Sequence, residues 1–234
     1  MKQMVAVLGV CEKEVPAAFL WLLWEAKLND RSFDTVVMLT KGAAKHQDVL
    51  MSAAGPNITF ATLDDEQERG YPGSASHLFV KSLEFCEKNY KDHPVLWLEV
   101  DAIPLDHGWK RLIRAEYNDC DTPFMGHLEL THSTPHMAGV GVYPADWRQR
   151  CPEIMDVLTA PDHPAFGPGC GQPWDMWCGK YILPQASQSA HIQQVWKCPS
   201  FTDENMGIIN PTTVLFHQSK DGSLIRQLWR QYTH

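Results

Sequence analysis

The chain has 234 residues, of which 44% are hydrophobic and 21% are charged. This composition is typical of a globular protein and excludes a mainly disordered chain. The formal net charge of −8 excludes a global positive field of the kind that gathers nucleic-acid backbones. A local basic strip stays open around Lys110, Arg111 and Arg114, or along Arg226 and Arg230, although solvated helix faces explain these charges equally well.

The seven cysteines are scattered and include no C-x-x-C pair, so neither a disulfide framework nor a zinc knuckle is indicated. The N-terminal residues lack the pattern of a secretory signal peptide, and no apolar stretch reaches the roughly 18 residues of a membrane span. We therefore expect a cytoplasmic protein that does not span a membrane.

The first 105 residues alternate between apolar runs and segments with helical spacing. The expected strands are Met4–Leu8, Thr35–Leu39, Ile58–Leu63 and Val95–Asp101. Helices are expected over Ala17–Leu28 and through Leu78, Phe79, Ser82, Leu83 and Cys86. This alternation predicts a Rossmann-like parallel α/β core. Neither G-x-G-x-x-G nor a P-loop motif is present, so neither a dinucleotide cofactor nor a Walker-type NTPase is supported.

The second half has a mixed pattern. A helix is expected over Gly108–Tyr117, then strands over Pro123–Leu130 and Met137–Tyr143, a helix over Trp174–Tyr181, a strand over Thr213–Phe216, and a last helix carrying Leu224, Ile225, Leu228 and Trp229. The length suits a single domain over residues 1–234, with a central sheet flanked by helices.

Two carboxylates follow the fourth expected strand, one residue apart. Residues i and i+2 of a strand point to the same side, so Glu99 and Asp101 can converge on one hard cation. The alternative is an acidic loop that leaves a strand.

A late strand leads into His217, followed by Lys220 and Gly222. A neutral imidazole is a metal ligand, a lysine pairs with phosphate, and glycine lets the backbone approach an anion. These residues together indicate a site for a diphosphate. The alternatives are a buried core histidine and a solvated turn.

At these motifs the chain resembles the GT-A class of nucleotide-sugar glycosyltransferases, and in particular small stand-alone enzymes of phage and bacterial type. In that class a DXD motif ends the fourth strand and a late histidine completes a divalent-metal site. Glu99-Val100-Asp101 matches the DXD position, with Glu in place of the first Asp, and His217 matches the late histidine.

The resemblance implies a metal-dependent hexosyl- or pentosyltransferase with a GT-A-like sheet. It implies Mn²⁺ or Mg²⁺ at Glu99, Asp101 and His217, and a nucleotide-sugar donor, with a UDP-sugar favoured. Residues 1–105 would bind the nucleotide, and residues 106–234 would bind the acceptor and carry a C-terminal motif for the metal and the diphosphate. The acceptor would be a glycan hydroxyl or, in a phage-encoded enzyme in the host cytoplasm, a hydroxymethylated DNA base.

Further residues are weaker candidates. Asp175, beside Trp174, is the candidate base if the reaction inverts, although a first-turn helix acid is an equal alternative. Asp64 is a candidate for contact with the ribose or base, and Tyr71 for stacking on the base, but plain turns explain both. His132 and His136 lie four apart, yet the Ser-Thr-Pro between them breaks a helix and disfavours a zinc pair.

Two other functions stay open. A nucleotidyltransferase that makes sugar nucleotides would need a Gly-rich basic loop after the first strand, and Gly9–Lys13 is a poor one. A non-catalytic nucleotide- or carbohydrate-binding module would tolerate loss of the metal set, whereas Asp101, His217 and Lys220 are all present.

Overall fold

The centre of the molecule is a seven-stranded mixed sheet. A computed structural model describes residues 3–63, 71–160 and 171–232, and the strand order is β3-β2-β1-β4-β7-β6-β8. The first four of these strands are parallel, whereas β7 runs antiparallel to both β4 and β6. The bounds are β1 (Val5–Val10), β2 (Thr35–Leu39), β3 (Ile58–Thr62), β4 (Val95–Leu98), β6 (Phe124–Glu129), β7 (His136–Tyr143) and β8 (Ala186–Gln188). The predicted mixed α/β sheet is confirmed.

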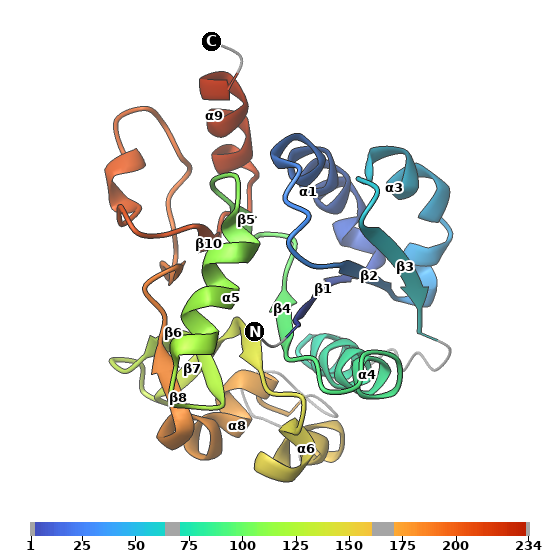
Figure 1. Cartoon of the computed structure of the whole chain (residues 1–234), viewed down its shortest axis with the longest axis vertical. Coiled ribbons are helices and arrows are strands. Elements are labelled where there is room, and N and C mark those ends of the chain that lie inside the picture. The colour runs from blue at the N-terminus through green and yellow to red at the C-terminus, as the bar shows by residue number, and fades with distance from the viewer. Residues whose placement is uncertain (1–2, 64–70, 161–170, 233–234) are drawn as a thin grey trace.

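Helices cover both faces of this sheet. Figure 1 shows α1 and α3 on one side of β1, β2 and β3, and α4 on the other. Successive residues of β1 alternate between two apolar clusters, because side chains of a strand point to opposite faces. The α-helices are α1 (Val15–Leu28), α2 (Lys41–Ala44), α3 (Gln47–Ala53), α4 (Gly73–Asn89), α5 (Trp109–Asp119), α6 (Trp147–Arg150), α7 (Glu153–Asp156), α8 (Trp174–Ile182) and α9 (Ser223–Tyr232). Short 3₁₀ turns span Glu12–Glu14, Val157–Thr159, Leu183–Gln185 and Met206–Ile208.

A second, three-stranded sheet joins distant parts of the chain. It contains β5 (Ile103–Pro104), β10 (Leu215–His217) and β9 (Ile192–Gln194), in the order β5-β10-β9. Phe216 lies opposite Ile103 in the antiparallel pair, and His217 lies opposite Gln194 in the parallel pair. The predicted strand Thr213–Phe216 therefore begins and ends later, and its last residue is His217.

Two tryptophans of α1 hold the segment that follows Asp101. The indole N–H of Trp21 donates to the carbonyl of Ala102 at 2.7 Å, and that of Trp24 donates to the carbonyl of Pro104 at 2.6 Å. Both side chains are fully buried, where an unpaired indole N–H would be costly. These bonds fix the backbone immediately after Asp101 against the core.

Lys110 does not belong to a basic surface strip. Its side chain is fully buried, and its Nζ lies 2.8 Å from Oε1 of Glu25. The same ammonium donates to the carbonyls of Asp30 at 3.1 Å and Phe33 at 3.3 Å. The ammonium of Lys110 thus joins α5 to α1, so both explanations left open for this residue, a basic strip and a solvated helix face, are wrong.

None of the described helices is long and apolar enough to cross a membrane. The six cysteines in the described ranges are all unpaired.

Candidate active site

The structure brings Glu99, Asp101 and His217 together beyond the C-terminal end of β4. Nε2 of His217 lies 3.3 Å from Oε2 of Glu99 and 3.3 Å from Oδ1 of Asp101. One ligand atom from each of the three residues lies within 4.8 Å of the other two. His217 is 4% exposed and Asp101 11% exposed, whereas Glu99 is 42% exposed, so the cluster opens to solvent on the Glu99 side.

The two carboxylates meet through a turn and not through a strand. Strand β4 ends at Leu98, and the N–H of Ala102 donates to the carbonyl of Glu99 at 2.9 Å. The expected strand over Val95–Asp101 is therefore too long, and the i, i+2 argument for convergence is wrong. The turn instead directs the side chains of Glu99 and Asp101 toward His217.

His217 is held from the other side by the small sheet. Strand β10 pairs with β5, which begins two residues after Asp101, and the N–H of Ser219 donates to the carbonyl of Asp101 at 3.3 Å. Backbone hydrogen bonds on both sides of the contact therefore set the separation of Asp101 from His217, although 116 positions divide them in the sequence.

The charged groups of the cluster shift each other's pKa values. Burial by itself would lower the pKa of His217, but the carboxylates of Asp101 and Glu99 outweigh burial and raise this pKa to about 10. Burial would raise the pKa of Asp101, but His217 and then Lys220 outweigh it and lower that pKa below its ordinary value. In the metal-free protein His217 is therefore protonated, and its Nε2–H donates to the carboxylates.

This donor set suits a divalent cation. Two carboxylates and an imidazole are hard to borderline ligands of the kind that bind Mn²⁺ and related ions. The proton on Nε2 supplies the positive charge between the carboxylates in the metal-free protein, and a divalent cation would supply it when bound. The Nδ1 atom of His217 is buried and has no hydrogen-bond partner among the described residues. No bond at Nδ1 therefore fixes the ring from behind, and its contacts to Glu99 and Asp101 are made by Nε2.

The loop after β10 places Lys220 near Asp101 and continues through Gly222 into α9. Lys220 is exposed and lies near enough to Asp101 to lower its pKa. Gln218 has a φ of 89°, which is strained for a residue with a side chain. Gly222 has a φ of +67° and leads directly into α9, whose first N–H group is capped by Asp221 Oδ1 at 2.9 Å. Gly222 thus serves the turn into α9; contact with a phosphate stays a prediction.

Asp175 also faces this cluster. It is the second residue of α8 and thus a first-turn acid of this helix, and among the described residues its Oδ1 accepts the adjacent N–H of Met176 at 2.9 Å. Partial burial is the main cause that raises the pKa of Asp175, and Glu99 adds to the effect while His136 opposes it. A carboxylate with a raised pKa is a better proton acceptor than an ordinary one.

Two glycines allow α8 and Glu99 to approach β7. A Cβ at Gly179 would lie 2.8 Å from both Cβ of His136 and the carbonyl oxygen of Pro135. A Cβ at Gly139 would lie 3.0 Å from the Trp174 ring and 3.1 Å from Oε1 of Glu99. Gly179 needs glycine, because a larger side chain would push α8 away from the backbone of the strand, whereas a Cβ at Gly139 would press on the Trp174 ring and displace the Glu99 carboxylate.

Of the two residues predicted to contact the nucleoside, the structure describes Tyr71 but not Asp64. Tyr71 is 62% exposed, and its pKa is raised first by partial desolvation and then by Asp175 and Glu99, which places its hydroxyl on the same side of the molecule as the cluster. Asp64 lies outside the described residues.

Sequence reasoning missed the role of His136. Its Nδ1–H donates to the carbonyl of Thr134 at 2.7 Å, and its Nε2 lies 3.9 Å from Oδ2 of Asp175. The rings of His132 and His136 are 5.3 Å apart and perpendicular, and they belong to no group of three possible metal ligands in the described ranges. The i, i+4 spacing drew attention to a zinc pair, whereas the contact that matters is with a residue 39 positions later.

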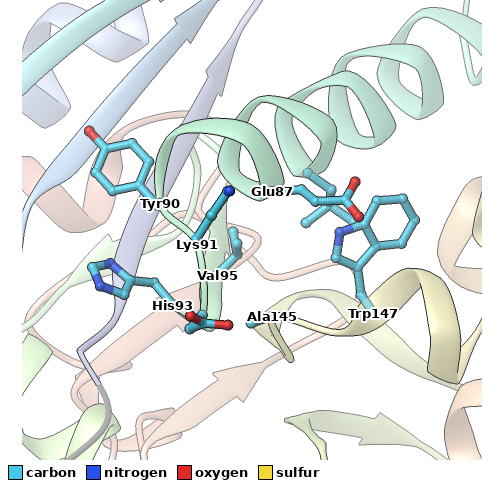
Figure 2. A pocket seen from close by; sticks show the side chains of 9 residues that line it. Glu87, Tyr90, Lys91, His93, Val95, Ala145 and Trp147 are labelled. Atoms are coloured by element: carbon cyan, nitrogen blue, oxygen red, sulfur yellow. The ribbon is translucent and has the colours of Figure 1, made fainter.

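A separate cavity of about 190 Å³ lies at the other end of β4 (Figure 2). Its lining includes Glu87, Tyr90, His93, Val95 and Trp147, and Val95 is the first residue of β4. It is therefore remote from the carboxylates that follow the last residue of that strand.

Comparison with known proteins identifies the fold. No family model matches the sequence, and no curated protein sequence matches it. Among solved structures, the galactosyltransferase LgtC in complex with donor and acceptor sugar analogues matches with a TM-score of 0.60 at 12% identity, over 97% of this chain and 96% of that chain. The fold is that of the GT-A glycosyltransferases.

Two larger proteins share the same fold. The glycosyltransferase GlyE of Streptococcus pneumoniae matches with a TM-score of 0.63 at 10% identity, over 98% of this chain and 60% of that chain. The bifunctional glycosyltransferase WbbM matches with a TM-score of 0.57 at 10% identity, over 93% of this chain and 46% of that chain. The expected GT-A-like sheet is therefore confirmed. The resemblance to small stand-alone enzymes of phage and bacterial type stays a prediction, because a shared fold does not test it.

Proposed function

We propose that the protein is a metal-dependent glycosyltransferase that moves a sugar from a nucleotide-sugar donor to a hydroxyl acceptor. The observation that carries this proposal is the cluster of Glu99, Asp101 and His217 at the C-terminal end of β4 in a GT-A fold. The C-terminal ends of the strands are where open α/β sheets bind their ligands. All three residues lie in segments whose backbones are held by hydrogen bonds, as a preorganised site requires.

The donor would lie across the end of β4. Asp101, His217 and Glu99 would hold Mn²⁺ or Mg²⁺, which when bound would neutralise charge on the departing diphosphate. Lys220 would pair with the diphosphate, and the backbone at Gly222 would approach it. Tyr71, which is largely exposed, would stack on the base, and Asp64 would contact the nucleoside. We propose a UDP-sugar as donor, with residues 1–105 binding the nucleotide within one domain. Residues 106–234 would bind the acceptor and carry the C-terminal motif for the metal and the diphosphate.

Asp175 would take the proton of the acceptor hydroxyl. Its raised pKa and its position facing Glu99 support this role. As the acceptor oxygen bonds to the anomeric carbon and the diphosphate leaves with its bonding electrons, the hydroxyl proton would pass to the Asp175 carboxylate. Asp175 has this role if the transfer inverts the configuration at the anomeric carbon.

The structure disfavours the nucleotidyltransferase alternative. Strand β1 is followed by the acidic 3₁₀ turn Glu12–Glu14, and the carboxylate of Glu14 accepts the N–H of Cys11 at 3.0 Å. A triphosphate would meet negative charge there instead of a Gly-rich basic loop. A sugar acceptor is favoured over a modified DNA base, because Lys110 is buried and adds nothing to a basic surface.

A thermal-shift titration tests the proposal. UDP, GDP, CDP and ADP are added with and without Mn²⁺ to the wild type and to Asp101→Ala and His217→Ala. Saturation at a hundredfold excess over Kd stabilises the folded state by about 2.7 kcal/mol, which a shifted Tm reports. We expect a Mn²⁺-dependent shift with UDP that both variants lose.

Asp48→Ala and His46→Ala are the matched controls, because both residues are exposed and distant in sequence from the cluster. They should retain the full shift. If no nucleotide shifts the Tm of the wild type in the presence of Mn²⁺, the glycosyltransferase proposal is wrong.

A further inference from the structure

Trp196 is unusual among the nine tryptophans, all of which lie in the described ranges. It is 55% exposed, whereas the other eight are buried or partly buried. An exposed indole presents a large apolar surface together with one polar N–H, a combination suited to a ligand that has both apolar and polar faces.

This indole begins a row of rings that leads to Asp175. Trp196 follows β9 by two residues, and Gln194 of β9 lies opposite His217. The ring of Trp196 lies 6.4 Å from that of His132, which lies 5.3 Å from that of His136. Nε2 of His136 in turn lies 3.9 Å from Oδ2 of Asp175. We use the name aromatic row for the three rings of Trp196, His132 and His136 together with Asp175, the carboxylate at their end.

Polar groups with unused hydrogen-bonding capacity lie beside this row. Nε2 of Gln194 donates to Oε1 of Glu129 at 3.1 Å, and the same carboxylate oxygen lies 3.6 Å from Nε2 of His127. Gln194 is 7% exposed, and its Oε1 atom has no hydrogen-bond partner among the described residues. Buried polar atoms without a partner are uncommon in folded proteins and point to a ligand or a water at the site.

We propose that the aromatic row binds a carbohydrate ring of the acceptor, with Trp196 stacked on the apolar face of the sugar. The proposal rests on the proposed function, because Asp175 is the reactive end of the row. The carboxylates of Glu129 and Asp175 repel phosphate groups, so they favour a neutral ligand that donates hydroxyl hydrogen bonds. A pyranose ring has this chemistry, and a nucleic-acid backbone does not.

The direct test uses ¹⁹F NMR of protein labelled with 5-fluorotryptophan, in which Trp196→Phe assigns the Trp196 resonance. Lactose, maltose, cellobiose and N,N′-diacetylchitobiose are titrated to millimolar concentration, with and without UDP and Mn²⁺. At least one of these disaccharides should shift the Trp196 resonance and leave that of the buried Trp109 in place. If none of the four moves the Trp196 resonance, the assignment of the row as a sugar subsite is wrong.

Kinetics separates this proposal from the proposed function. Trp196→Ala should raise the KM for the acceptor about tenfold, the loss expected for one aromatic contact. Tyr181→Ala, which removes an exposed aromatic of α8 outside the row, should leave this KM unchanged. An unchanged acceptor KM in Trp196→Ala overturns the subsite, whereas absence of UDP-sugar turnover in the wild type overturns the proposed function and leaves the NMR result to decide on sugar binding.

Discussion

Binding of a divalent cation at Glu99, Asp101 and His217 should release one proton per ion at neutral pH. The pKa of His217 is raised to about 10 in the metal-free protein, so Nε2 carries a proton, and a cation bound by that nitrogen must displace it. Displacement at pH 7.5 costs about 3 kcal/mol, because each pKa unit corresponds to about 1.4 kcal/mol. The Kd for the cation should therefore fall about tenfold for each unit of rising pH across the neutral range.

Isothermal titration calorimetry measures this proton directly. Mn²⁺ is titrated at one pH in two buffers of different ionisation enthalpy, and the difference in observed heat gives the number of protons released. The wild type and His46→Gln should release about one proton, and His217→Gln close to none. A wild-type count near zero, or a Kd that stops changing above pH 7, would show that His217 is neutral in the metal-free site and would refute the reasoning.

The same proton sets the sign of the pH dependence of stability. Because the folded pKa of His217 lies above the unfolded value, its contribution to the free energy of unfolding is fully present below the unfolded pKa, about 6.5. This contribution is lost as the pH rises from there through about 10. Without metal, urea unfolding of the wild type should therefore show a decline toward alkaline pH that His217→Gln lacks.

Three substitutions test other parts of the structure. Gly139→Ala should weaken Mn²⁺ binding about tenfold by displacing Glu99, as changes to supporting residues of metal sites do, whereas Gly207→Ala, where a Cβ meets nothing within 4 Å, should leave the calorimetric Kd unchanged. Lys110→Met should lower the free energy of urea unfolding by about 3–5 kcal/mol, because Glu25 is left as an unpaired buried charge, and the double variant with Glu25→Leu should recover most of the loss. Lys220→Ala should weaken UDP binding about tenfold without changing the Kd for Mn²⁺ alone; an equal loss for both ligands would contradict its assignment to the diphosphate.

Apolar runs and turn residues predicted the elements of the main sheet well. Thr35–Leu39 is a strand with the expected bounds, and Ala17–Leu28 lies wholly within α1. The predicted strand that begins at Val95 is too long. Apolar character continues through Val100, but the hydrogen bond from the N–H of Ala102 to the carbonyl of Glu99 already closes a turn there. Hydropathy reports burial and does not report which backbone groups pair.

Contacts between distant segments could not be predicted from local patterns. Lys110 looked like a surface charge because its neutralising partner, Glu25, is 85 positions away. The contact between His136 and Asp175 depends on close packing of α8 on β7 at Gly179, which no spacing rule encodes. The order of Glu99, Asp101 and His217 along the chain did identify a cluster, since their residue types share one chemistry wherever the fold places them.

Because of the small sheet, the distance between Asp101 and His217 does not depend on the length of the chain segment between them. The register of β5 with β10 places Ile103 opposite Phe216, and this pairing fixes Asp101 and His217 relative to each other whatever lies between them. The segment between these strands contains β6, β7, α8 and Trp196, the parts that we assign to the acceptor. Insertions and deletions in the loops of that segment can therefore change which acceptor is bound while the cation ligands keep their geometry, so acceptor preference can diverge among related chains without loss of the donor chemistry.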